Sequence, residues 1–281
     1  MENTYDCEPT LTDSQVLEFC RKGFLMLEAV VPDEINRQVV EFFATQPRGS
    51  NAATIDGVVE NVFLNPQAAG AARSLLGKNF TYPFHLGEGH RADCPMPAGP
   101  WHVDGGAVFG PKLDSLLGFY YPQDTPPELG PTELLPGSHF LIADGIPSMA
   151  HYGSIKGAFS TAAPAGSIFL SAYTVWHRRT ASTVKAVRNL SKYGYTRTVP
   201  PERDWIREPD FQPSRAKGLP AGPNYHREYH RAINDAAEMF YWLCGKEEEY
   251  RVLAQYNQPV FLSAYHDVRI SQSVNEQTRR P

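Results

Sequence analysis

The stretch that decides how this chain is interpreted reads Trp101-His102-Val103-Asp104. Residues two apart on a β-strand point to the same face, so an extended backbone here lets His102 and Asp104 reach one metal ion. A second histidine, His177, ends another apolar run, and Arg188 follows it by eleven residues. These four side chains are the candidate functional residues on which the interpretation is built.

Short apolar runs bounded by Gly, Pro or Asp lie on both sides of this stretch. They predict strands over residues 81–86, 99–104, 116–121, 132–135, 167–177 and 190–196. Many short strands punctuated in this way are typical of a β-sandwich or a jelly roll. An antiparallel pairing of the strand that ends at His177 with the strand that begins near Arg188 would turn both side chains toward one cavity.

Helices are expected on the outside of one sheet. Thr12-Asp13-Ser14 predicts the cap of a helix over 15–22, which Gly23 ends before a strand over 24–31. Pro32-Asp33-Glu34 predicts the start of a second helix that runs to about Ala44. The remaining expectations are a polar loop over 45–60 and helices over 66–76 and 229–245.

Composition narrows the class of protein. The 281 residues carry 42% hydrophobic and 20% charged side chains and a net charge of −5, which fits a globular enzyme and offers no basic stripe for nucleic acid. Met1 to Gln15 lacks the apolar run of a signal peptide, and no stretch approaches the roughly eighteen apolar residues that span a bilayer. The four cysteines form no CxxC pair, so we expect reduced thiols and a cytoplasmic protein.

A proline-rich segment follows the predicted strands. Residues 200–228 hold six prolines interleaved with aromatic and charged side chains, which favours a lid or binding loop over a regular sheet. We therefore predict a single domain over 1–281, with a jelly-roll core over about 80–200, this lid or loop, and a C-terminal helix.

The four candidate residues fit one kind of chemistry. Two imidazoles and one carboxylate on one face of an iron ion leave the opposite face open, as in the facial triad of non-haem Fe(II) oxygenases. Arg188 then fits as a bidentate partner for the distal carboxylate of 2-oxoglutarate. The HxD pair alone is a weak signal for a metal site, because many sequences contain one by accident. The surrounding sequence is therefore needed to judge whether the pair binds a metal ion.

That context resembles the phytanoyl-CoA dioxygenase family of Fe(II)/2-oxoglutarate oxygenases from about residue 12 to residue 196. The resemblance rests on segments that occur in the family's order, the most specific being the PGSH block. These segments are Gly23-Phe24-Leu25-Met26-Leu27, Val31-Pro32-Asp33-Glu34, Trp101-His102-Val103-Asp104, Leu129-Gly130-Pro131-Thr132-Glu133-Leu134-Leu135-Pro136-Gly137-Ser138-His139, Gly166-Ser167-Ile168-Phe169-Leu170, Trp176-His177 and Arg188.

The resemblance implies a mainly β fold with flanking helices, a double-stranded β-helix of the jelly-roll or cupin-like type. It implies that Fe(II) is held by His102, Asp104 and His177, and that Arg188 binds 2-oxoglutarate with Thr132 facing the same cosubstrate. The family often places a polar residue before the HxD histidine to touch the keto acid, whereas this chain has Gly99, Pro100 and Trp101 there. Three aromatic residues could make that contact instead: Tyr120, Tyr121 and Trp101. We predict that Tyr120 makes it.

The implied activity is a dioxygenase reaction that consumes O₂ and 2-oxoglutarate and releases succinate and CO₂. Related halogenases have a small residue in place of the carboxylate, so Asp104 favours hydroxylation of a C–H bond. The expected substrate is a small-molecule metabolite or natural product of secondary metabolism, and the expected state is a monomer or homodimer. Alternatives are desaturation or epoxidation, a non-catalytic metal- and 2-oxoglutarate-binding module, and a cupin-like lyase or isomerase that would not need Arg188.

Competing motifs are weaker. His226 and His230 are four apart but lack the glutamate that follows the first histidine in HExxH zinc sites. The loose cluster of His85, His90, Asp93 and Cys94 is a poor metal site, for which lining of a substrate site is an alternative, and Ser138-His139 is interpreted as a structural turn. Scattered basic residues are expected to be solvated, although they could meet an anionic substrate: Arg91, Arg178, Arg179, Arg207 and Arg215.

Overall fold

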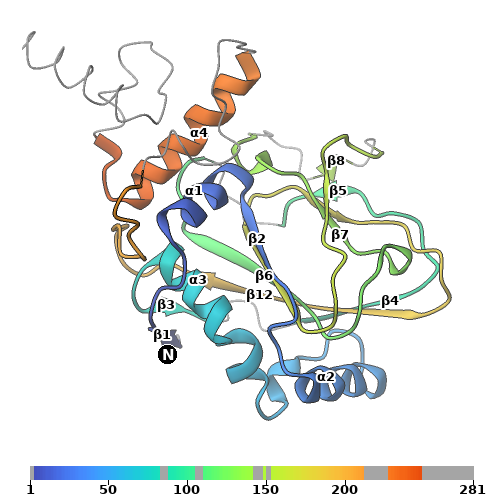
Figure 1. Ribbon diagram of the computed structural model, residues 1–281. Helices are drawn as coiled ribbons and strands as arrows, with labels where there is room; N and C mark the ends of the chain where they lie inside the picture. Colours follow the sequence, from blue (N-terminus) through green and yellow to red (C-terminus); the bar gives the residue numbers. More distant parts are fainter. Residues whose placement is uncertain are drawn as a thin grey trace, which may run out of the picture.

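Two antiparallel sheets face each other in the computed structural model, which describes residues 3–82, 88–104, 110–141, 148–149, 153–211 and 227–248. The large sheet has the order β1-β3-β12-β6-β10-β2, with β4 also paired to β12. The small sheet has the order β8-β5-β11-β7-β9. This arrangement is a double-stranded β-helix, so the predicted jelly roll is confirmed (Figure 1).

The strands are short, as the punctuation of the sequence indicates. The large sheet contains β1 (Thr4–Tyr5), β2 (Phe24–Leu27), β3 (Phe80–Thr81), β4 (Glu88–Asp93), β6 (Ser115–Tyr121), β10 (Ser167–Ala172) and β12 (Val187–Thr196). The small sheet contains β5 (Trp101–His102), β7 (Thr132–Leu134), β8 (Ser148–Met149), β9 (Phe159–Ser160) and β11 (His177–Arg179). Residues 83–86 of the strand predicted over 81–86 lie outside the described residues.

The four predicted helices are present, with bounds that lie within two residues of the predicted ones. Helix α1 (Asp13–Lys22) has the Thr12 hydroxyl accepting from the Gln15 amide in a capping box, and Gly23 ends it in the left-handed region with φ 83°. The other α-helices are α2 (Asp33–Thr45), α3 (Pro66–Leu76) and α4 (Arg227–Leu243). The loop predicted over 45–60 contains two helical turns, the 3-10 helix Ala52–Thr54 and the start of the π-helix Val59–Phe63.

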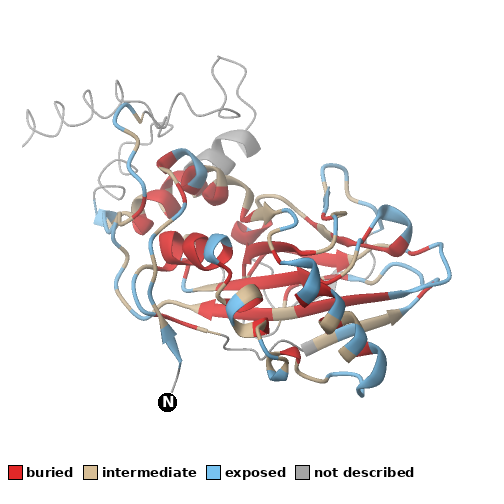
Figure 2. Ribbon diagram, turned by 60° about the horizontal axis from the view of Figure 1, so that its bottom comes forward, coloured by how far each residue is buried: buried red, intermediate tan, exposed pale blue. Residues whose placement is uncertain are grey.

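The core lies between the large sheet and the helices on its outer face (Figures 1 and 2). Every residue of β10 is buried, as expected for a central strand covered on both faces. Phe119 of β6 and Phe169 of β10 stack at 4.3 Å on the inner face. On the outer face, Gly118 of β6 is required, because a Cβ there would lie 2.5 Å from the ring of Tyr193.

One predicted strand is in fact two. The apolar run 167–177 forms β10 in the large sheet, turns at Tyr173-Thr174, and enters the small sheet as β11 at His177. The expected antiparallel pairing of the His177 and Arg188 strands is therefore wrong, since β11 pairs with β5 and β7 whereas β12 pairs with β3, β4 and β6. The two residues face the cavity from opposite sheets.

The PGSH block forms the structural turn that was predicted. The Gly137 amide donates to Lys22 O, and His139 Nε2 lies 3.0 Å from Cys20 O, so the turn is fixed to α1. The Ser138 hydroxyl donates to Leu135 O and accepts from the Trp176 amide at 2.9 Å. Burial lowers the pKa of His139 to about 4, so this histidine is neutral. The turn therefore positions the backbone next to His177.

The proline-rich segment begins against the N-terminal helix. Trp205 Nε1 and the Glu208 amide donate to the buried carboxylate of Asp13, both at 2.8 Å, and Arg203 forms an ion pair with it. In the described part, 200–211, these contacts anchor the segment to α1, and no residue lines the cavity discussed below. Residues 212–226 lie outside the described residues, so the lid or binding loop stays a prediction.

Candidate metal centre

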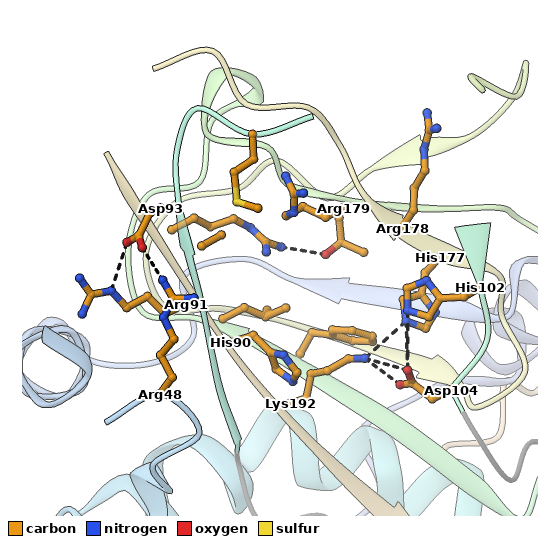
Figure 3. Close-up of a pocket in the computed structure, with 16 residues that line it drawn as sticks. Arg48, His90, Arg91, Asp93, His102, Asp104, His177, Arg178, Arg179 and Lys192 are labelled. Atoms are coloured by element: carbon orange, nitrogen blue, oxygen red, sulfur yellow. Dashed lines mark hydrogen bonds and ion pairs between the residues drawn. The ribbon is translucent and has the colours of Figure 1, made fainter. Parts of the chain in front are cut away.

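His102, Asp104 and His177 lie together between the two sheets. His102 and His177 are directly opposite each other in the β5–β11 pair, and their rings are 4.4 Å apart. Asp104 Oδ1 lies 3.8 Å from His102 Nε2 and 3.7 Å from His177 Nε2. One ligand atom from each residue lies within 4.8 Å of the others, so the predicted triad is assembled (Figure 3).

The orientation of both imidazoles is fixed by the backbone. His102 Nδ1 lies 3.0 Å from Pro100 O, and His177 Nδ1 lies 3.0 Å from Val175 O. A carbonyl can only accept, so each Nδ1 carries the proton and each Nε2 keeps its lone pair. This second hydrogen bond is the one that metal-binding histidines usually make.

The donor set fits one divalent ion. Imidazole nitrogens and carboxylate oxygens bind such ions at about 2.0–2.2 Å, so two ligand atoms of one ion lie at most about 4.4 Å apart, and about 3 Å apart when they are neighbours on one face. The separations of 3.7 and 3.8 Å from Asp104 Oδ1 lie between these two values, so small movements of the three side chains would bring them onto one ion. Two nitrogens and one carboxylate oxygen on one side of the site match a facial triad.

A lysine occupies the space beside the triad. Lys192 Nζ donates to Asp104 Oδ2 at 2.7 Å and to Oδ1 at 3.0 Å, and lies 3.5 Å from His177 Nε2 (Figure 3). Burial acts to raise the pKa of Asp104, but the Lys192 ammonium and the two histidines outweigh it and hold that pKa below its usual value. Burial, followed by the nearby Lys192 charge, lowers the pKa of His177 to about 3.

Arg188 lies in the same cavity, on the large sheet. Its side chain is buried with 3% exposure, and Nη2 donates to Thr132 Oγ1 at 3.0 Å. The guanidinium lies over the ring of Tyr121, whose hydroxyl accepts from the Thr132 amide at 2.9 Å. The buried Nε has no hydrogen-bond partner. A buried cation with an unused donor fits an anionic ligand such as the distal carboxylate of 2-oxoglutarate.

The triad and Arg188 line one cavity of about 500 Å³. Apolar parts of its wall come from Phe119, Leu190 and Met96, and Thr132 contributes a polar group. The volume lies within the range of about 300–1,000 Å³ typical of small-molecule sites. The cavity can therefore hold a small molecule beside the ligand atoms.

Tyr120 does not lie in this cavity. Strand β6 alternates, so Phe119 points inward whereas Tyr120 points to the outer face, where its hydroxyl donates to Asn36 Oδ1 of α2 at 2.6 Å. Trp101 also points away, with Nε1 donating to Gly153 O. The choice of Tyr120 as a cofactor contact is corrected, and Tyr121 is the candidate tyrosine next to Arg188 and Thr132.

The basic residues divide between the cavity and its surroundings. Arg178 is among the residues that line the cavity, but its guanidinium extends away from the triad in Figure 3, where it is paired to Glu133 and lies over the ring of Trp101. Arg91 and Arg48 share Asp93 at the rim. Arg179 donates to the backbone oxygens of Pro97 and Thr180. The predicted residue Arg215 lies outside the described residues.

The competing metal motifs gain no support from the described residues, whereas His90 and Asp93 line the cavity, as the alternative for their cluster predicts. Cys94 Sγ faces the carbonyls of Ala92 and Leu129, Asp93 pairs with arginines, and His90 lines the cavity. His85, His226 and the side chain of His230 lie outside the part that the structure describes. Lys192 is the residue that sequence motifs did not reveal as a partner of the triad, although strand alternation from Arg188 places it on the same face.

Solved structures share the fold. SnoN, a non-haem α-ketoglutarate-dependent epimerase from nogalamycin biosynthesis, matches with TM-score 0.53 and 16% identity over 75% of this chain and 92% of its own. HygX from Streptomyces hygroscopicus, with nickel and 2-oxoglutarate bound, matches with TM-score 0.51 and 17% identity over 78% and 99%. The apoform of EctD from S. alaskensis matches with TM-score 0.54 and 18% identity over 80% and 90%.

At these identities the similarity shows the fold alone. No protein-family model matches the sequence, and no curated protein matches it as a relative. The fold on which SnoN, HygX and EctD are built is therefore shown for this chain, and its chemistry has to be argued from its own residues.

Proposed function

We propose that the protein is an Fe(II)/2-oxoglutarate-dependent oxygenase of the phytanoyl-CoA dioxygenase type. The observation that carries the proposal is the presence, in one cavity, of a facial triad with both Nε2 atoms available and a buried arginine with an unused donor. A metal-dependent lyase or isomerase would have no need of that arginine.

In this proposal His102, Asp104 and His177 hold the iron. Iron and 2-oxoglutarate together activate dioxygen and supply the oxidising power that removes hydrogen from a C–H bond of the substrate. Asp104 fills the position that halogenases leave open for halide, which favours hydroxylation over halogenation.

The chain itself contributes orientation and exclusion of water. Arg188 and Thr132 bind the distal carboxylate of 2-oxoglutarate, and the hydrogen bond between them fixes the plane of the guanidinium before the ligand arrives. Phe119 and Leu190 form an apolar wall beside the ligand atoms, which keeps bulk water from the reacting groups.

The substrate is proposed to be a small metabolite or natural product. HygX with nickel, 2-oxoglutarate and hygromycin B bound is an example of a protein of this fold that holds a small molecule together with the metal and the cosubstrate. We further propose a single domain over the whole chain, a monomer or homodimer, and a cytoplasmic location. No helix in the described part of the chain is long and apolar enough to cross a membrane.

The test is turnover of 2-oxoglutarate to succinate by the purified protein with Fe(II) and O₂. The expected result is slow succinate formation that a member of a metabolite collection accelerates, and that a His102→Ala, His177→Ala variant lacks. A protein that binds Fe(II) and 2-oxoglutarate yet forms no succinate under any of these conditions would instead be a non-catalytic binding module.

A further inference from the structure

The cation closest to the triad comes from the chain itself. Lys192 lies on β12 with its side chain 16% exposed, and its ammonium donates to both oxygens of Asp104. Asp104 Oδ1 is also the oxygen that faces the two histidines. The ammonium therefore lies against two of the three atoms that would bind the metal, since His177 Nε2 is 3.5 Å away.

We propose that Lys192 is an internal cation that holds Asp104 in place when the triad is empty and competes with the metal ion for it. The proposal depends on the proposed function in one respect, that the triad binds a metal ion. It adds a positioning role for a residue that supplies no ligand atom.

Geometry and charge both require the competition. An ion bound to Asp104 Oδ1 and His177 Nε2 would lie about 2.0–2.2 Å from each, in the same corner of the cavity as the ammonium. A dication and an ammonium a few ångströms apart repel strongly in a partly buried site. Metal binding must therefore break or weaken the bond from Lys192 to Asp104 Oδ1.

The cavity offers Lys192 few other partners. Among the described lining residues the acids are Asp93 and Asp104, and Asp93 is paired with Arg48 and Arg91. The ring of Phe119, 5.1 Å from Nζ, can make a cation–π contact with the displaced ammonium. This contact is weaker than the ion pair with Asp104. Metal binding therefore replaces the ion pair between Lys192 and Asp104 by the weaker contact between Lys192 and Phe119. This loss lowers the net affinity of the site for the metal ion.

The proposal predicts effects of opposite sign when the charge is removed. Lys192→Met leaves Asp104 without its ion pair in the metal-free protein, so the metal-free variant unfolds at a lower temperature than the wild type. The same change removes the positive charge that competes with the metal ion, so Co(II) should bind about tenfold more tightly or better. The repulsion between the metal ion and a nearby ammonium is larger than the free energy that corresponds to a tenfold change in affinity.

The experiment titrates Co(II) into the metal-free protein by calorimetry and records thermal unfolding with and without Co(II). Lys192→Gln is measured beside Lys192→Met, and Lys185→Met, an exposed lysine just before β12, is the matched control and should bind Co(II) like the wild type. Damage to the fold would weaken binding, so tighter binding by both Lys192 variants supports the competition.

Unchanged or weaker Co(II) binding in both Lys192 variants would overturn the proposal. The proposed function fails differently: wild-type protein would then bind no Co(II), or bind it equally well after His102→Ala and His177→Ala. The two failures are therefore distinguishable in one series of titrations.

Discussion

The two walls of the cavity carry different chemistry. The small sheet supplies the histidines from β5 and β11, and backbone carbonyls fix both rings with Nε2 free. The large sheet supplies Arg188 and Lys192, two cations on one face of β12. In the proposed function the two histidine ligands and the carboxylate-binding Arg188 therefore rest on separate sheets, so the effects of substituting them can be measured separately, whereas Lys192 reaches across to Asp104.

The largest expected effect is on the metal-binding wall. Asp104→Gly should reduce succinate formation to background, because the only anionic ligand of the triad is lost, while a weakened metal site held by two histidines remains. Azide, titrated into the anaerobic Fe(II)–2-oxoglutarate complex and followed by absorption, should bind more readily than in the wild type. Near wild-type turnover in this variant would show that Asp104 is not a necessary ligand.

On the opposite wall, Arg188→Leu should weaken 2-oxoglutarate binding strongly while leaving metal affinity intact. Removal of the charged partner of a buried carboxylate typically costs about 3–5 kcal/mol, which is a loss of roughly 100-fold or more in affinity. Calorimetric titration of 2-oxoglutarate into the Co(II)-loaded protein measures it. Arg178→Leu is the control, because the guanidinium of Arg178 is already paired with Glu133, and an equal loss there would contradict the assignment.

A smaller effect is expected where the walls meet. Thr132→Val removes the hydroxyl that accepts from Arg188 and that, in the proposed function, also contacts the distal carboxylate, while it keeps the shape of the side chain. A hydrogen bond to a charged group contributes about 1.5–3 kcal/mol, so 2-oxoglutarate affinity should fall by roughly 10-fold or more, but by less than in Arg188→Leu. The same calorimetric titration measures this affinity. A loss of affinity larger than that in Arg188→Leu would show that the main contact with the carboxylate is made by Thr132.

The smallest effect on ligand binding is expected at Tyr120. Tyr120→Phe removes a buried hydrogen bond to Asn36 and should destabilise the protein by about 1 kcal/mol, with 2-oxoglutarate affinity unchanged. Urea unfolding measures the first quantity and calorimetry the second. Weaker 2-oxoglutarate binding without loss of stability would show that Tyr120 contacts the ligand and that its assignment to the outer face is wrong.

The sequence predicts local features well. The capping box at Thr12, the end of α1 at Gly23 and the face shared by His102 and Asp104 all follow from interactions within a few residues. The break between β10 and β11 cannot be predicted in this way, because the mostly apolar run 167–177 contains no Gly, Pro, Asn or Asp that would indicate a turn. Strand β4 is also missed, since Glu88–Asp93 is a polar edge strand without an apolar face.

Long-range pairing is what the sequence leaves open in the site. The side of the sheet on which Tyr120 lies depends on the register of β6, and a shift of one residue exchanges it with Phe119. The pairing of Lys192 with Asp104 joins residues 88 positions apart. Neither can be derived from spacing, whereas the triad could be predicted, because its members lie in segments that resemble those of a known family.

Metal stoichiometry tests the central claim most directly. The account predicts that wild-type protein binds one Fe(II) or Co(II) per chain under anaerobic conditions, and that the His102→Ala, His177→Ala variant binds almost none. A His226→Ala, His230→Ala variant, which removes the competing histidine pair, should retain the wild-type stoichiometry. Full metal loading of the His102→Ala, His177→Ala variant, with loss of metal from the His226→Ala, His230→Ala variant, would contradict the account and move the metal site away from the triad.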